Sequence, residues 1–215
     1  APVPLTIEFD AAGVEIRSAA LQLFVDDFQA PKLRSRFQVK IDERDVPDLA
    51  ATLNDLEQTG PIGKLVTLQF LPEYLDLLAD GKLVIWIDDP EHNVGEGFAF
   101  DFARLLINPK QWRHAGVVRG VAVDKATNAP IGGVLVSAAN VRQMETSADG
   151  RFELPGVPAG LVVTSGSHPE YQGASEQRDL EAGQTIELVL KLAKNTNTSE
   201  ALAEQLEEEG KVDLY

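Results

Sequence analysis

The amino-acid sequence predicts an all-β fold made of two tandem β-sandwich domains. Two observations support this class. Short segments of apolar or alternating apolar and polar residues recur along the whole chain, and turn residues separate them. The chain has 215 residues, and the strands predicted within residues 118–192 account for only one sandwich, so a second core is expected in the first half.

Residues 1–110 contain the first set of predicted strands. The pattern alternates in 5–10, 37–41 and 98–103, residues 20–25 are apolar except for Gln22, residues 83–87 are continuously apolar, and residues 64–70 are a further predicted strand. A continuous apolar run predicts a strand that is buried on both faces. In the last strand we expect Phe98, Phe100 and Phe102 to point to the same face, because side chains alternate along a strand. Six or more short strands favour an antiparallel β-sandwich.

Two helical segments interrupt these strands. Leu49, Leu53 and Leu56 fall on one helical face, and Asp48 is the predicted N-cap. Pro72 suits the first position of one or two further helical turns, because proline presets the helical φ.

The second half carries the most specific pattern. Asp149-Gly150 supplies the positive φ of a tight turn before Phe152, which we expect to fill the core. The sequence Pro-Ala-Gly at 158–160 turns the chain again, and residues 186–192 alternate strictly.

Taken in order, these positions resemble the carboxypeptidase regulatory-like family. The resemblance covers residues 116–193 and implies a transthyretin-like, Greek-key β-sandwich that serves as a non-catalytic accessory. Asn128 and Glu170 stand where glycine is usual in the family. Asparagine tolerates the left-handed region, so the first departure is compatible with the expected turn.

The last segment, residues 196–215, differs in kind. It begins with a polar spacer, continues with an acidic stretch that predicts a short C-terminal helix, and ends in Lys-Val-Asp-Leu-Tyr. This ending resembles the lead-in to an outer-membrane-protein-A-like peptidoglycan-binding domain. We therefore expect a linker toward a missing domain, with self-association through the tail. The first residue is Ala1, not methionine, and a removed secretory signal is the favoured explanation.

Charge and composition restrict the partners. The net charge is −15, divided as −9 in residues 1–110, −1 in 111–195 and −5 in 196–215. An acidic chain without a basic stripe repels phosphate, so nucleic acid is an unfavourable partner, while cations or a basic partner are favourable. No apolar run approaches the roughly 20 residues that span a bilayer. The sequence has no cysteine, which excludes disulfides and thiolate chemistry.

Acidic residues give the sharpest candidate metal site. Asp26 and Asp27 end one predicted strand, Asp88 and Asp89 end another, and Asp101 lies in the last strand of the first half. If these strand ends lie side by side, the carboxylates would offer the oxygen ligands that Ca²⁺ prefers. The alternative is that they are solvated aspartates that favour turns at strand ends.

Aromatic residues give a second candidate. Trp86, Trp112 and Tyr171 could stack on sugar rings if they are exposed, although Trp112 is expected to lie between the two domains. Tryptophans that are exposed to solvent would favour sugar binding, whereas buried tryptophans would favour a structural role.

Catalytic patterns are weak. His92, His114 and His168 occur singly, and Ser165-Gly166-Ser167 precedes no helix, so it lacks the context of a nucleophile elbow. No catalytic residue or cofactor is predicted.

These observations lead to one hypothesis and two alternatives. The domains are expected at 1–110, 111–195 and 196–215, the last being a linker or helical tail. The favoured function is a non-catalytic scaffold and recognition module, the amino-terminal part of an exported bacterial protein of the periplasm or cell surface. Its partner would be a protein or a cell-wall carbohydrate. A carbohydrate-binding pair of sandwiches is the leading alternative, and a hydrolase within residues 1–110 is less favoured.

Overall fold

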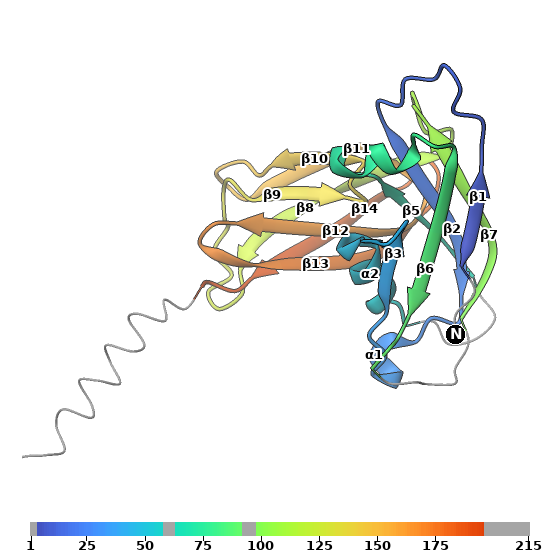
Figure 1. The fold of residues 1–215 in the computed structure, drawn as a ribbon. Helices are drawn as coiled ribbons and strands as arrows, with labels where there is room; N and C mark the ends of the chain where they lie inside the picture. The colour runs from blue at the N-terminus through green and yellow to red at the C-terminus, as the bar shows by residue number, and fades with distance from the viewer. Residues whose placement is uncertain (1–3, 58–62, 92–97, 196–215) are drawn as a thin grey trace, which may run out of the picture.

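The computed structural model describes residues 4–57, 63–91 and 98–195 (Figure 1). Within these residues the chain forms three β-sheets and a few short helices, which confirms the all-β class. The predicted C-terminal helix and the tail 196–215 lie outside the described residues. No helix among the described residues is long and apolar enough to cross a membrane.

The first part of the chain packs two sheets against each other. One sheet has the order β1-β6-β3-β4, and β5, β2 and β7 face it. The core between these two sheets contains the inward-facing residues of both. Among them are Leu21, Leu23, Ile41 and Ile85, all nearly inaccessible to solvent. The elements are β1 (Leu5–Glu8), β2 (Ala19–Asp26), α1 (Ala30–Leu33), β3 (Gln38–Ile41), β4 (Arg44–Asp45), α2 (Pro47–Asn54), β5 (Lys64–Gln69), η1 (Pro72–Leu78), β6 (Lys82–Asp88) and β7 (Ala99–Ile107).

Two details of these elements differ from the sequence prediction. Helix α2 begins at Pro47 with Val46 in the N-cap position, so Asp48 lies inside the first turn and is not the cap. Pro47 presets the helical φ and has no N–H to satisfy, which lets the helix start without a side-chain cap. Strand β6 is buried on one face only: Leu83, Ile85 and Ile87 enter the core, and the intervening side chains point outward.

A β-bulge corrects the prediction for the phenylalanines of β7. Phe24 pairs with Phe102, but the next residue of β2, Val25, pairs with Phe100, so Asp101 is an extra residue on β7. The extra residue reverses the side-chain alternation. Phe98 and Phe100 therefore pack on the core, whereas Phe102 lies on the opposite face and stacks on Phe24.

The second part of the chain forms its own core between two sheets. A three-stranded sheet has the order β11-β8-β14, with β14 parallel to β8. Strands β10, β9, β12 and β13 face it. Phe152 is 4% exposed in this core, which confirms its predicted role. The elements are β8 (Ala115–Asp124), β9 (Leu135–Ala138), β10 (Arg142–Glu145), β11 (Arg151–Pro158), β12 (Gly160–His168), β13 (Tyr171–Leu180) and β14 (Thr185–Leu192).

The turns of the second part take the backbone conformations that the sequence predicts. Gly150 has a φ of 75° in the turn before β11, and Asn128 has a φ of 57°. Asparagine thus adopts the left-handed conformation at the position where the related family has glycine.

One sheet runs through both parts of the chain. Strand β12 pairs with β9 and then, at Leu161, with Val66 of β5, so the order β10-β9-β12-β5-β2-β7 is continuous. Beside this point, the Gln69 amide donates to the Ala139 carbonyl at 3.2 Å. Figure 1 shows the second part projecting from one side of the first at this junction. The two predicted sandwiches are therefore joined through their backbones, a feature that the sequence pattern did not indicate.

Candidate functional site

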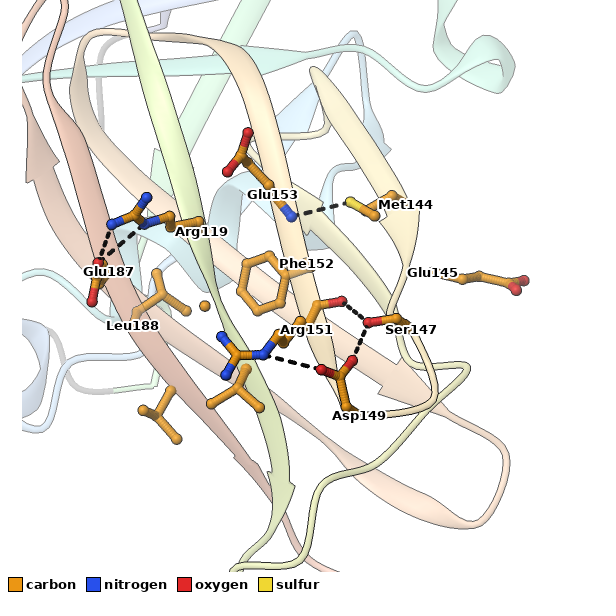
Figure 2. Close-up of a pocket in the computed structure, with 13 residues that line it drawn as sticks. Arg119, Met144, Glu145, Ser147, Asp149, Arg151, Phe152, Glu153, Glu187 and Leu188 are labelled. Carbon is orange, nitrogen blue, oxygen red and sulfur yellow. Dashed lines mark hydrogen bonds and ion pairs between the residues drawn. The ribbon is translucent and has the colours of Figure 1, made fainter.

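A groove with a volume of about 880 Å³ lies over the three-stranded sheet β11-β8-β14 (Figure 2). It is lined by residues of the three strands, by the turn before β11 and by β10. Its surface combines apolar positions such as Val121 and Val189 with charged positions such as Arg119 and Arg151. We call it the charged groove.

A row of charges crosses the sheet at the centre of the groove. The pairing of the strands places Glu153 and Glu187 on either side of Arg119. Figure 2 shows the Arg119 guanidinium reaching Glu187, and its Nε donates to Oε1 at 3.0 Å. This hydrogen bond raises the pKa of Arg119, and Glu153 contributes to the same effect through its charge. The row is a cross-strand pairing of opposite charges, which favours this register.

A second charged cluster lies at the turn between β10 and β11. The Ser147 hydroxyl donates to Asp149 Oδ1 at 2.6 Å, and Arg151 Nε donates to Oδ2 at 3.0 Å (Figure 2). The Ser147 hydrogen bond is the main reason that the pKa of Asp149 lies below its usual value, and the nearby charge of Arg151 adds to it. Both Asp149 oxygens are thereby engaged.

Side chains of β10 cover the edge of β11 beside the groove. The Glu153 amide donates to Met144 Sδ at 3.3 Å, and the Pro155 carbonyl accepts from Arg142 Nε at 3.1 Å. Pro155 itself has no N–H to offer. This edge is protected against the addition of another strand, so a ligand of the groove would contact side chains.

Two charged groups of the groove, Asp149 and Arg119, have shifted pKa values. General acid–base catalysis works best with a pKa near the operating pH. Here hydrogen bonding moves the pKa of Asp149 down and that of Arg119 up, away from neutrality in both cases. Asp149 and Arg119 are therefore charged at neutral pH, each paired with a neighbour in the groove.

The carboxylates of the predicted calcium site are distributed over different sheets. Asp26 and Asp101 lie on β2 and β7 of the seven-stranded sheet, whereas Asp88 lies on β6 of the four-stranded sheet. Asp27 Oδ1 accepts from the Gln29 side chain at 2.7 Å. The two oxygens of Asp89 accept from the amides of Arg36 and Glu91 at 3.0 and 3.2 Å.

Among the described residues, no three carboxylates or histidines come together as a metal site. The local bonds of Asp27 and Asp89 are typical of aspartates in turns. The calcium site at Asp26, Asp27, Asp88, Asp89 and Asp101 stays a prediction without structural support.

The three aromatic candidates have different environments. Trp86 is 36% exposed on the outer face of β6 and lines a groove of about 690 Å³. Trp112 is half-buried in the connection before β8. Tyr171 is half-buried against the second core, with its ring 5.3 Å from that of His168. Of the three, Trp86 has both the exposure and the groove that ring stacking requires.

One comparison with known proteins concerns the second part of the chain. The core and turns of this part, together with the parallel pair β8–β14, position the residues of the charged groove. Residues 117–193 match the carboxypeptidase regulatory-like domain. This range is about a third of the chain and coincides with the predicted resemblance. No curated protein matches the chain.

Solved structures match at low similarity. The group B streptococcus pilus 2b backbone protein is 13% identical with a TM-score of 0.33, and the match covers 91% of this chain and 93% of that one. The minor pilin GBS52 of Streptococcus agalactiae is 16% identical with a TM-score of 0.34, and 84% of each chain is covered.

A cohesin–X-dockerin complex of Acetivibrio cellulolyticus is 20% identical with a TM-score of 0.30. This match covers 36% of the present chain and only 56% of the other.

The charged groove itself was not found by sequence reasoning. The alternation of residues 118–124 and 186–192 does place Arg119 and Glu187 on outward faces. Their approach depends on the parallel pairing of β8 with β14, two strands that are far apart in the sequence. The alternation of apolar and polar residues indicates on which face of a strand a side chain lies, but it does not indicate which strand lies beside it.

Proposed function

We propose that the chain is a non-catalytic scaffold and recognition module of the bacterial cell envelope. In this role the first part of the chain is a rigid support, and the regulatory-like part presents the charged groove to a protein partner. The observation that carries the proposal is the continuous sheet through β12 and β5, because a scaffold must hold its recognition surface in a fixed orientation.

Side chains reinforce the junction of the two parts. Leu161 of β12 packs against the core of the first part. The Asn140 amide donates to Asp48 Oδ2 at 2.9 Å, and Lys64 Nζ lies 2.5 Å from Asp179 Oδ2. Main-chain pairing together with apolar packing resists bending more than a flexible linker would.

The groove favours a partner that carries basic groups. Four carboxylates, those of Glu145, Asp149, Glu153 and Glu187, line it together with two arginines. The chain as a whole has a net charge of −15. Charge complementarity of this kind steers association and suppresses wrong partners. The envelope location in this proposal rests on the resemblance of the tail to the lead-in of a peptidoglycan-binding domain.

Spin-label distance measurements test the stiffness on which the proposal depends. The chain has no cysteine, so substitutions such as Thr6→Cys and Gln143→Cys place one label on each part at exposed positions. We expect a single narrow distance distribution. The control pair Gln143→Cys and Lys191→Cys lies within the second part and sets the width for a rigid body. A distribution much broader than that of the control would overturn the scaffold proposal.

Substrate panels test the absence of catalysis. We expect no turnover of ester, glycoside or peptide substrates by the full chain. Turnover that one substitution in residues 1–110 abolishes, with the fold intact by circular dichroism, would favour the hydrolase alternative.

A further inference from the structure

The outer face of the four-stranded sheet carries an aromatic platform that the charged groove does not involve. Trp86 lies at the middle of β6, between the buried residues Ile85 and Ile87, so its ring is directed away from the core. It is 36% exposed, although tryptophan is usually well buried. The ring lines a groove of about 690 Å³, within the usual size range of small-molecule sites.

Polar side chains surround the ring in positions that the sheet fixes. Lys40 of β3 is directly opposite Trp86, and Gln38 is directly opposite Asp88. Lys40 Nζ lies 3.8 Å from Asp45 Oδ1. Because these side chains share one face of two paired strands, they border the indole ring on fixed sides.

Several of these polar groups are available to a ligand. Within the described part of the chain, the side-chain amide of Gln38 and the carboxylates of Asp88 and Glu43 make no hydrogen bond. Gln38 and Lys40 supply donors, whereas Gln38, Asp88 and Glu43 supply acceptors. The groove thus offers an aromatic face together with both kinds of hydrogen-bonding group.

We propose that this groove binds a carbohydrate, with a sugar ring stacked on Trp86. A pyranose ring has an apolar face of C–H groups for the indole and a rim of hydroxyls that both donate and accept. A purely apolar ligand would leave Gln38 and Asp88 without partners. A phosphate-rich ligand would meet Asp88, Glu43 and a net charge of −15. A neutral, short oligosaccharide matches both the ring and the polar groups.

Intrinsic fluorescence and a glycan array test the proposal. Trp86 and Trp112 are the two tryptophans of the sequence, so Trp112→Phe leaves Trp86 as the single reporter. We expect the array to identify a glycan, and its oligosaccharide to change the fluorescence of the Trp112→Phe variant in a saturable way. Failure of every arrayed glycan to bind would overturn the proposal.

Variants separate the platform from a general surface effect. Trp86→Ala is expected to weaken binding at least tenfold, whereas Trp86→Tyr, which retains an aromatic face, should lose much less. Gln38→Ala and Asp88→Asn are expected to weaken it several-fold. Val189→Ala, at an exposed apolar position in the charged groove, is the matched control and should bind like the parent. Equal affinity of Trp86→Ala and the parent, measured by calorimetry, would contradict the proposal, as would equal losses in the control.

Discussion

Gly160 allows the two parts of the chain to meet at the start of β12. Its φ is 133°, a conformation that other residues rarely adopt. A Cβ atom at this position would lie 2.4 Å from the carbonyl oxygen of Leu65 in β5. The glycine that ends the Pro-Ala-Gly turn therefore also permits the close approach of β12 to the first part.

Gly160→Ala is predicted to destabilise the protein more than Gly133→Ala. Gly133 also has a positive φ, 74°, but a Cβ there would meet nothing within 4 Å. We expect about 1 kcal/mol for the strain at Gly133 and a further ~1–3 kcal/mol for the clash at Gly160. Urea denaturation gives both values. Equal losses in the two variants would show that β5 yields to the added methyl group.

Asp42 illustrates the cost of a partly buried carboxylate. Its Oδ1 accepts from the Val84 amide at 3.0 Å, while Oδ2 is buried without a partner among the described residues. Burial is the main cause that raises its pKa above the usual 3.8. The charged form is therefore held less favourably in the folded state than in the unfolded chain.

Asp42→Asn is predicted to leave the melting temperature at pH 7 unchanged or to raise it. Asparagine can keep the acceptor for Val84 and tolerates the φ of 46°. Because the pKa of Asp42 is raised in the folded state, protonation of Asp42 stabilises the folded parent protein. This stabilisation is present below pH 3.8 and is lost as the pH rises through the folded pKa. Any advantage of the variant should thus shrink in acid. A large loss of stability at pH 7 would show that the charge itself is needed.

At the scale of elements, the turn after β8 depends on one carboxylate. Asp124 Oδ1 accepts from the amides of Ala126 and Thr127, both at 2.9 Å, and from the Thr127 hydroxyl at 3.1 Å. The hydrogen bond from the Thr127 amide is the largest of the effects that lower the pKa of Asp124. These bonds hold the chain so that Asn128 can take its left-handed conformation.

Asp124→Ala is predicted to lower the melting temperature at neutral pH. A lowered pKa means that the stabilisation is present above the unfolded value, near 3.8, and is lost as the pH falls through the folded pKa. The difference between parent and variant should therefore decline below about pH 4. Melting curves from pH 2 to 7 measure it, with Lys125→Ala in the same turn as the control. A difference that does not depend on pH would contradict this assignment.

At the scale of the whole molecule, two hydrophobic cores share one sheet. The first core uses residues up to 107 together with Leu161, and the second uses residues from 118 onward. Contacts across β5 and β12 couple the cores, because opening one part exposes the paired edge of the other.

The coupling predicts one cooperative unfolding transition in calorimetry, with equal calorimetric and van't Hoff enthalpies. Leu161→Ala should cost about 1–2 kcal/mol, less than a fully buried leucine, and should separate the transition into two. Leu135→Ala, at a residue that is 43% exposed in the second part, is the control and should keep one transition. Two transitions in the parent protein would mean that the junction does not couple the parts.

The sequence by itself determined the class of fold and the local structure of this protein. Alternation identified the strands, and Asp149-Gly150 identified a turn, because both depend on residues that are near each other in the chain. The motif order in residues 116–193 was specific enough to identify the regulatory-like part. The exposure of Trp86 was not predicted, because the apolar run in which it lies does not show which face of the strand will be covered by a second sheet.

Only the tertiary structure decided the features that join distant segments. The bulge at Asp101 reversed one phenylalanine, the pairing of β8 with β14 assembled the charged groove, and the contact of β12 with β5 fused the two parts. Each depends on which strand lies beside which. The periodicity of the sequence determines on which face of its own strand a side chain lies. Which strand lies beside it depends on the free energy of packing the whole core.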